Sequence, residues 1–140
     1  MESGKQGYET LLHRAFASLP HLSEENVDFK IPEADAIIQG SNTIIRNFKQ
    51  IADVARRPKE EIETYLTKEL AAHINNEQQG VVISARITNA VLKNKIEKYF
   101  QTYVVCKECH KPDTHTESIS RGFMTLICEA CGARYTVKYY

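Results

Sequence analysis

Near the start of the chain, apolar residues recur every three or four positions, which is the spacing of one face of an α-helix. This apolar face comprises Tyr8, Leu11, Leu12, Ala15, Phe16 and Leu19. Pro20 ends the pattern because proline has no amide N–H to continue a helix. We therefore predict a helix within residues 1–20, with residues 1–7 polar and frayed, and a polar linker over residues 21–30.

A short amphipathic helix beyond a polar linker has two uses, and its pattern does not choose between them. The helix either folds back on the protein's own core or offers its apolar face to the groove of a partner. A helix of about three turns is marginal in isolation, so its apolar face must be covered by one surface or the other.

Residues 31–103 are predicted to form a compact α/β domain with a small antiparallel sheet and packed helices. Short β-prone runs, Gly and Pro breaks and helical apolar rows set the element boundaries. In chain order we predict a strand over 36–39, a helix over 42–55, a helix over 59–70, a hairpin with strands 71–75 and 81–87, and a helix over 89–103.

Residues 104–140 contain all four cysteines of the chain, in two Cys-x-x-Cys pairs: Cys106 with Cys109, and Cys128 with Cys131. The 18 residues between the pairs fall in the spacing range of a tetrathiolate zinc site. Three strand-like runs, 114–120, 123–127 and 134–140, complete the pattern of a zinc ribbon.

Four protein ligands would complete a tetrahedron and leave no position for a reactive water, so we predict one structural Zn²⁺. The same thiolates could hold rubredoxin-like iron, and two disulfides are a weaker alternative. His110 follows the first pair, where it is a competing ligand or a solvated turn residue. The apolar core of 104–140 is small, so metal binding worth roughly 10–16 kcal/mol should dominate its folding. We therefore expect Cys128→Ser to unfold the ribbon and to leave residues 31–103 folded.

Composition narrows the function classes. Hydrophobic residues make up 42% of the chain and charged residues 26%, which is typical of a folded soluble protein. No apolar run approaches the roughly 20 residues that span a bilayer, and no signal peptide is recognised, so we expect a cytoplasmic protein. The chain has 18 basic and 18 acidic residues, so strong non-specific binding to nucleic acid is not predicted.

Enzyme motifs are missing from the sequence. The phosphate-binding loop, the His-Glu-x-x-His zinc motif and the Gly-x-Ser-x-Gly elbow are absent, and the five histidines have no convergent spacing with acidic residues. We therefore predict a binding module and no enzyme. Lys93, Lys95 and Lys98 cluster on the outer side of the last predicted helix, as a solvated face or a modest contact with RNA or protein.

Two runs of the sequence are specific enough to indicate a family. The first is Ile37–Phe48 (IIQGSNTIIRNF). The second begins at Val104 (VVCKEC), continues with Lys111–Thr114 (KPDT), and closes with Cys128–Arg134 (CEACGAR). Both runs resemble the beta subunit of archaeal translation initiation factor two. The resemblance covers nearly the whole chain in the family's order: helix, linker, α/β domain, zinc ribbon. His110 stands where the family usually has Gly.

The resemblance implies a heterotrimeric GTP-binding complex that delivers initiator methionyl-tRNA to the small ribosomal subunit. It implies that the beta subunit has no chemistry of its own and docks on the gamma GTPase subunit through its N-terminal helix, with the alpha subunit completing the complex. The residues of the apolar face would then be the partner-binding residues.

Two other hypotheses about the function remain. The N-terminal half of eukaryotic initiation factor five shares the α/β domain and the ribbon but activates GTP hydrolysis, and the extra N-terminal helix argues against it. A zinc-ribbon nucleic-acid-binding module of the transcription-factor type is the second alternative, which the neutral charge balance disfavours.

Overall fold

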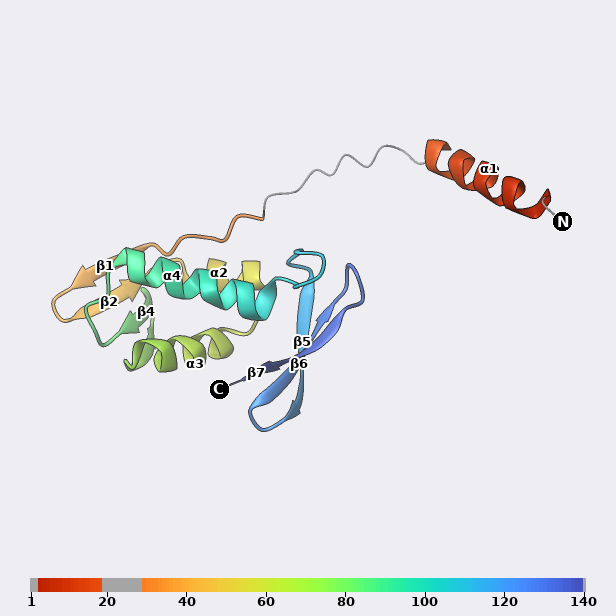
Figure 1. Ribbon diagram of the computed structural model, residues 1–140. Helices are drawn as coiled ribbons and strands as arrows, with labels where there is room; N and C mark the ends of the chain where they lie inside the picture. Colours follow the sequence, from red (N-terminus) through yellow and green to blue (C-terminus); the bar gives the residue numbers. More distant parts are fainter. Residues whose placement is uncertain (1–2, 19–28, 140) are drawn as a thin grey trace.

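The computed structural model describes residues 3–18 and 29–139 (Figure 1). The first helix, α1 (Ser3–Ser18), lies within the predicted range 1–20 and includes part of the segment that we expected to be frayed. Residues 7–18 of α1 are all exposed, and α1 lies apart from the two sheets (Figure 1). Leu19 and most of the predicted linker lie outside the described residues.

A four-stranded antiparallel sheet forms the first half of the folded body. Its strands are β1 (Ala36–Gln39), β2 (Asn42–Ile45), β3 (Ile74–Glu77) and β4 (Gly80–Ile83). The spatial order is β1-β2-β4-β3, so two tight hairpins lie side by side with β2 paired to β4. The predicted strand over 36–39 is present, and so is the predicted hairpin, although its strands are shorter than predicted. Asn76, Glu77 and Gly80, which we expected in the turn, belong to the strands.

Strand β2 is where the sequence-based prediction is wrong, because we expected a helix from residue 42. Gln39 and Asn42 face each other across the two-residue turn Gly40-Ser41, and Gly40 has φ +62°. The three residues after Asn42 (Thr43, Ile44 and Ile45) are β-branched and favour a strand. Ile44 and Ile45 both fit the apolar row of the predicted helix, and both belong to β2. Because they suit a helix and a strand alike, the sequence pattern did not reveal the boundary. The full predicted row is Ile44, Ile45, Phe48, Ile51, Ala52 and Ala55.

Three helices cover this sheet: α2 (Phe48–Ala55), α3 (Lys59–Leu70) and α4 (Asn89–Tyr99). After Tyr99, α4 continues into a π-helical turn, η1 (Phe100–Val104), in which the amide of Val105 donates to the carbonyl of Phe100 over 2.7 Å. The buried rows of α2 and α4 pack against the inner face of β2 and β4, where Ile45 and Ile83 are fully buried.

The C-terminal region is a three-stranded antiparallel sheet with β6 in the centre. Its strands are β5 (Thr114–Ser120), β6 (Phe123–Cys128) and β7 (Arg134–Lys138). Alternate residues point to opposite faces, so Met124, Leu126 and Val137 are buried on one face while Phe123 is exposed on the other. These strands match the predicted ribbon.

A single hydrophobic core runs through both sheets. Met124, Leu126 and Val137 of the ribbon belong to the same buried cluster as Phe100 and Tyr103 of the turn after α4. Tyr103 also donates its hydroxyl to the carbonyl of Lys138 over 2.8 Å. The domain boundary between residues 103 and 104 stays a prediction, and so does the expectation that residues 31–103 stay folded without the ribbon. The shared core implies that loss of the ribbon lowers their stability.

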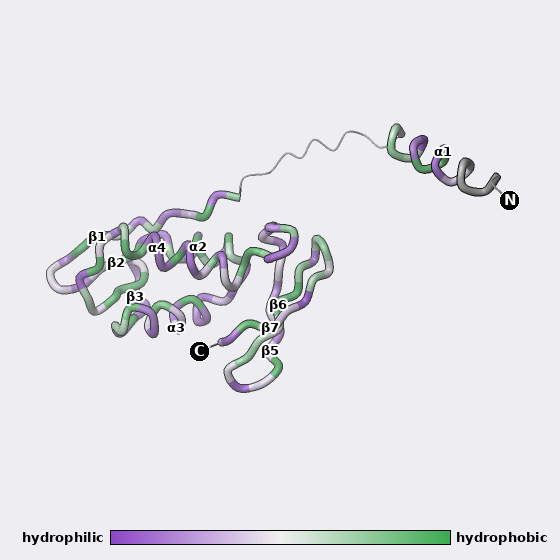
Figure 2. The backbone as a smooth tube through the Cα atoms, in the orientation of Figure 1, coloured by the Kyte–Doolittle hydropathy of each residue, from purple (hydrophilic) through white to green (hydrophobic). Residues whose placement is uncertain are grey.

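The fold class is α+β, as predicted: an N-terminal helix, a sheet with packed helices, and a C-terminal cysteine ribbon. Along the described part of the chain, no helix is both long and apolar enough to cross a membrane. Figure 2 shows apolar and polar segments alternating along the helices and strands.

Candidate metal centre and exposed helix

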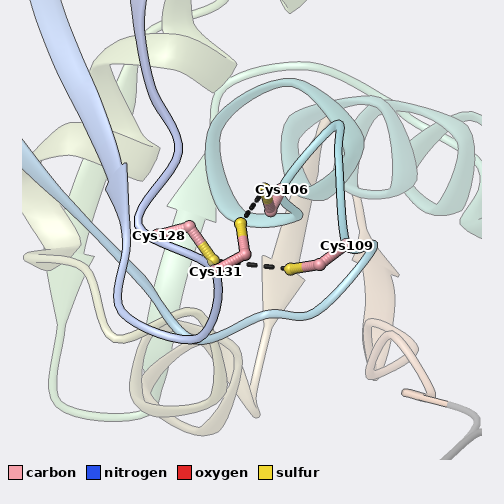
Figure 3. Close-up of side chains that lie close together, drawn as sticks. All are labelled: Cys106, Cys109, Cys128 and Cys131. Atoms are coloured by element: carbon pink, nitrogen blue, oxygen red, sulfur yellow. Dashed lines mark hydrogen bonds between the residues drawn. The ribbon is translucent and has the colours of Figure 1, made fainter. Parts of the chain in front are cut away.

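The four cysteine sulfurs converge at one end of the ribbon (Figure 3). Cys106 and Cys109 follow the turn after α4, while Cys128 ends β6 and Cys131 lies in the loop that leads to β7. All four Sγ atoms lie within 4.8 Å of one another. Across the two pairs, Cys106 and Cys131 are 3.6 Å apart and Cys109 and Cys128 are 3.5 Å apart. The prediction that the two pairs form one site is therefore confirmed as a cluster able to hold a metal ion.

The two cysteine turns repeat one backbone geometry. The amide of His110 donates to the carbonyl of Cys106 over 3.0 Å, and the amide of Gly132 donates to the carbonyl of Cys128 over 2.9 Å. Both donors have positive φ, +58° for His110 and +75° for Gly132. His110 thus occupies the position in the first turn that glycine occupies in the second. It serves as a turn residue and does not belong to the four-sulfur cluster.

Backbone hydrogen bonds hold the two turns together. Cys128 faces Thr114 in the β5–β6 ladder, and the amide of Glu129 donates to the carbonyl of Asp113 over 2.9 Å. The segment between the first turn and β5 is thereby fastened beside the second turn. The arrangement of the sulfurs depends on this pairing as well as on the spacing within each Cys-x-x-Cys.

The four thiols influence one another's protonation. Burial acts to raise the pKa of Cys128, but the amides of Cys131 and Ala130 and the thiol of Cys109 donate to its sulfur and lower the pKa to about 7. The amide of Ala133 acts to lower the pKa of Cys131, but desolvation and the neighbouring sulfurs outweigh it and raise the pKa to about 12. Ionisation of one thiol therefore disfavours ionisation of its neighbours, and a bound cation would offset the repulsion between the thiolates.

This donor set is able to hold a metal ion. Four thiolates at mutual distances below 5 Å suit a tetrahedral soft-metal ion, and all the coordination positions are supplied by protein. Cys106 and Cys128 are buried and Cys131 is exposed, so the site lies at the surface with two ligands anchored in the fold.

The second candidate site is the apolar face of α1. Tyr8, Leu11 and Phe16 are 65–67% exposed, Leu12 is 40% exposed, and Ala15 is exposed as well. These are the five described members of the predicted face, and the sixth, Leu19, lies outside the described residues. No described residue of the sheets or helices covers them, which leaves the apolar face open.

The lysines of α4 are engaged in ion pairs. Lys93 lies 2.8 Å from Glu33, Lys95 lies 2.7 Å from Glu69, and Lys98 lies 3.5 Å from the same carboxylate oxygen of Glu69. The interpretation as a solvated and locally neutralised face therefore accounts for these lysines better than an RNA contact does.

Sequence reasoning overlooked one buried charge, Arg57, which contacts Thr114 at the start of the ribbon. An Arg-Arg-Pro segment after a helix reads as an exposed loop, and nothing in the local pattern distinguishes buried Arg57 from its exposed neighbour Arg56.

Comparisons with known protein families and with individual proteins agree on one family. A family profile for a domain found in initiation factors 2B and five matches residues 20–134. Proteins named translation initiation factor 2 subunit beta are similar to the chain over most of its length. The one from Methanococcus aeolicus is 34% identical over 99% of both chains, and the one from Methanocaldococcus jannaschii is 38% identical over 90% of this chain and 87% of its own.

A third such protein, from Picrophilus torridus, is 37% identical over 94% of this chain, which spans 63% of that relative's length. The chain therefore belongs to the family of the beta subunit of archaeal translation initiation factor 2.

Proposed function

We propose that the chain is the beta subunit of a heterotrimeric GTP-binding initiation factor and docks on the gamma subunit through α1. In this complex the gamma subunit binds GTP and initiator methionyl-tRNA, the alpha subunit completes the heterotrimer, and the assembly delivers the tRNA to the small ribosomal subunit. The beta subunit is a cytoplasmic binding protein with no catalytic step of its own. Family membership supports this assignment.

The observation that carries the docking proposal is the exposed apolar face of α1. Tyr8, Leu11 and Phe16 each leave about two thirds of their surface in water. Burying a large apolar side chain stabilises a complex by roughly 1.5–3 kcal/mol before association costs. A helix that presents several such side chains along one stripe fits a hydrophobic groove on a partner.

The charges of the folded body support a protein partner over direct binding to nucleic acid. The lysines of α4 already pair with Glu33 and Glu69, so few cations there are available for phosphates. A transcription-type zinc ribbon would need strong salt-dependent affinity for nucleic acid in the absence of any partner.

Calorimetric titration into a purified archaeal gamma subunit tests the docking. The intact chain should bind, and a version that starts at His21 should not. Equal binding by both versions would remove α1 from the interface. Absence of binding by the intact chain would refute the assignment to this complex.

We further propose that the ion held by Cys106, Cys109, Cys128 and Cys131 is Zn²⁺ in a structural role. A cluster of four thiolates suits zinc, and also iron. Metal analysis of protein purified without added metal should give one zinc per chain. Stoichiometric iron with the absorption of a ferric tetrathiolate would identify the site as rubredoxin-like.

A further inference from the structure

A buried cation lies at the junction of the central sheet and the ribbon. Arg57, in the loop between α2 and α3, is only 6% exposed. Its Nη1 donates to the carbonyl of Thr114 over 2.7 Å, and its Nη2 donates to the carbonyl of Tyr103 over 2.8 Å and to Oγ1 of Thr114 over 2.9 Å. Longer bonds from Nη1 reach the carbonyls of Ala55 and Arg56. One guanidinium therefore joins α2, the turn after α4 and β5.

The acceptors around Arg57 are four carbonyls and one hydroxyl, and none of its hydrogen bonds in the described structure goes to a carboxylate. Instead, the cation lies at the C-terminal ends of α2 and of the turn after α4. The last carbonyls of a helix have no partner within it and carry its negative partial charge, so they favour a cation. Burial lowers the pKa of Arg57, while the charges of Tyr99 and Glu61 oppose that shift.

The π-helical turn leaves two of its carbonyls free to accept hydrogen bonds from outside the turn. The bond from Val105 to Phe100 takes up the Phe100 carbonyl, while the carbonyl of Tyr103 faces Arg57 and that of Val104 accepts the Thr114 hydroxyl. Thr114, itself 2% exposed, thus touches both the end of α4 and the guanidinium.

Thr114 also connects this junction to the metal centre. It is the first residue of β5, and its partner in the ladder is Cys128. If the metal is lost, the two cysteine turns are no longer held together, and the pairing that positions Thr114 is weakened. Arg57 then keeps its charge in the interior with fewer acceptors, and an under-solvated buried cation is strongly unfavourable.

We propose that Arg57 couples metal binding at the four cysteines to the stability of the central sheet, so that the metal stabilises strands that it does not touch. This inference goes beyond membership of the initiation factor and does not depend on the docking partner. The shared apolar core provides a background of contact between the two parts. Arg57 adds a specific interaction whose loss is costly, because its carbonyl partners are left buried as well.

The test uses the full-length, metal-loaded protein and amide hydrogen exchange in β4, at Val82 and Ile83. Removal of the metal with a chelator under reducing conditions should accelerate exchange at these amides by at least about tenfold, a usual size for coupling between two sites. In metal-loaded Arg57→Met, these amides should exchange faster than in the metal-loaded unchanged protein. Removal of the metal from this variant should then change the exchange rates little.

The matched control is Arg56→Met. Arg56 is the neighbouring residue and also reaches the ribbon, but its ion pair with Asp113 is exposed and 3.6 Å long. This variant should respond to metal removal as the unchanged protein does. If Arg57→Met does not fold, Thr114→Val removes the hydroxyl that accepts from Arg57 and donates to the carbonyl of Val104, and it should reduce the response partially.

Two results would overturn the proposal. If metal removal leaves the exchange rates in β4 of the unchanged protein the same, the two parts are not coupled. A full metal response in a folded Arg57→Met or Thr114→Val variant would assign the coupling to the apolar core instead.

Discussion

At Gly80 the chain passes so close to strand β2 that a side chain has no room. A Cβ atom at this position would lie 2.3 Å from the carbonyl oxygen of Ile45, and Gly80 has φ +136°. Both the contact and the backbone conformation demand glycine. The close pairing of β2 with β4 therefore depends on a residue that the sequence presents only as a turn glycine.

Gly80→Ala should destabilise the protein by about 2–3 kcal/mol, because β2 and β4 must separate and the backbone is strained as well. Gly40→Ala is the control, since Gly40 also has positive φ but has nothing within 4 Å of an added Cβ; it should cost about 1 kcal/mol. Urea unfolding of both variants measures the difference. Equal losses would mean that the Ile45 contact relaxes freely.

The two cysteine turns differ at one equivalent position, His110 in the first and Gly132 in the second. A non-glycine residue in the left-handed region is strained by about 1 kcal/mol. His110→Gly should therefore raise the unfolding free energy of the metal-loaded protein by up to about 1 kcal/mol, and Gly132→Ala should lower it by a similar amount. Thermal denaturation of both variants measures the two changes. A loss of stability in His110→Gly would show that the imidazole contributes contacts worth more than the strain.

At the scale of whole elements, α3 and α4 are joined by a charge cluster as well as by apolar packing. The Glu69 carboxylate, on α3, accepts from Lys95 and lies near Lys98 on α4. The hydrogen bond from Lys95 is the main reason that the pKa of Glu69 lies below its usual value. An interaction that lowers a carboxyl pKa stabilises the fold where the carboxylate is ionised.

Glu69→Gln should destabilise the protein at neutral pH by about 0.5–1 kcal/mol, because the pair is partly exposed. The difference in unfolding free energy between the variant and the unchanged protein should be complete above the ordinary carboxyl pKa of 4.5. It should disappear as the pH falls through the lowered pKa of Glu69 in the folded protein. Glu77→Gln, at an exposed site in β3, serves as the control. A difference between Glu69→Gln and the unchanged protein that stays constant down to strongly acidic pH would exclude an electrostatic origin.

Helix α1 differs from the other helices because no described residue covers its apolar face. Phe16 is 66% exposed, so its truncation removes no core contact within the chain. If Phe16 is a central anchor on the gamma subunit, Phe16→Ala should weaken that complex by about 2–4 kcal/mol without changing the stability of the free protein. Arg14→Ala, on another side of α1, should have little effect on the affinity measured by calorimetry. Equal effects of the two variants would place the interface elsewhere.

At the scale of the whole molecule, one core crosses the junction of the two sheets. Leu126 and Val137 of the ribbon lie in the cluster that also contains Phe100 of the central region. The metal-loaded protein should therefore unfold in a single transition, because a ribbon that separates first would expose part of this core.

Differential scanning calorimetry checks this expectation, with equal calorimetric and van't Hoff enthalpies as the expected outcome. Two resolved transitions would restore the independence of the two regions that the sequence suggested. The comparison with chelated protein then measures how much of the total stability the metal supplies.

The sequence by itself determined the features that depend on short spacings. The apolar face of α1, the strand over Ala36–Gln39, the helix over Lys59–Leu70, the ribbon strands and both cysteine pairs follow from periodicity, turn residues and ligand spacing. These patterns are local, because the residues that create them lie within a few positions of one another.

Only the tertiary structure decided the features that depend on distant partners. Residues 42–45 form strand β2 because β1 and β4 lie on either side of it, although their apolar residues also fit a helical row. The lysines of α4 are neutralised by carboxylates far away in the sequence, and Arg57 is buried because Tyr103 and Thr114 surround it. Burial and charge pairing are set by these long-range neighbours, and no local pattern of residue types contains that information.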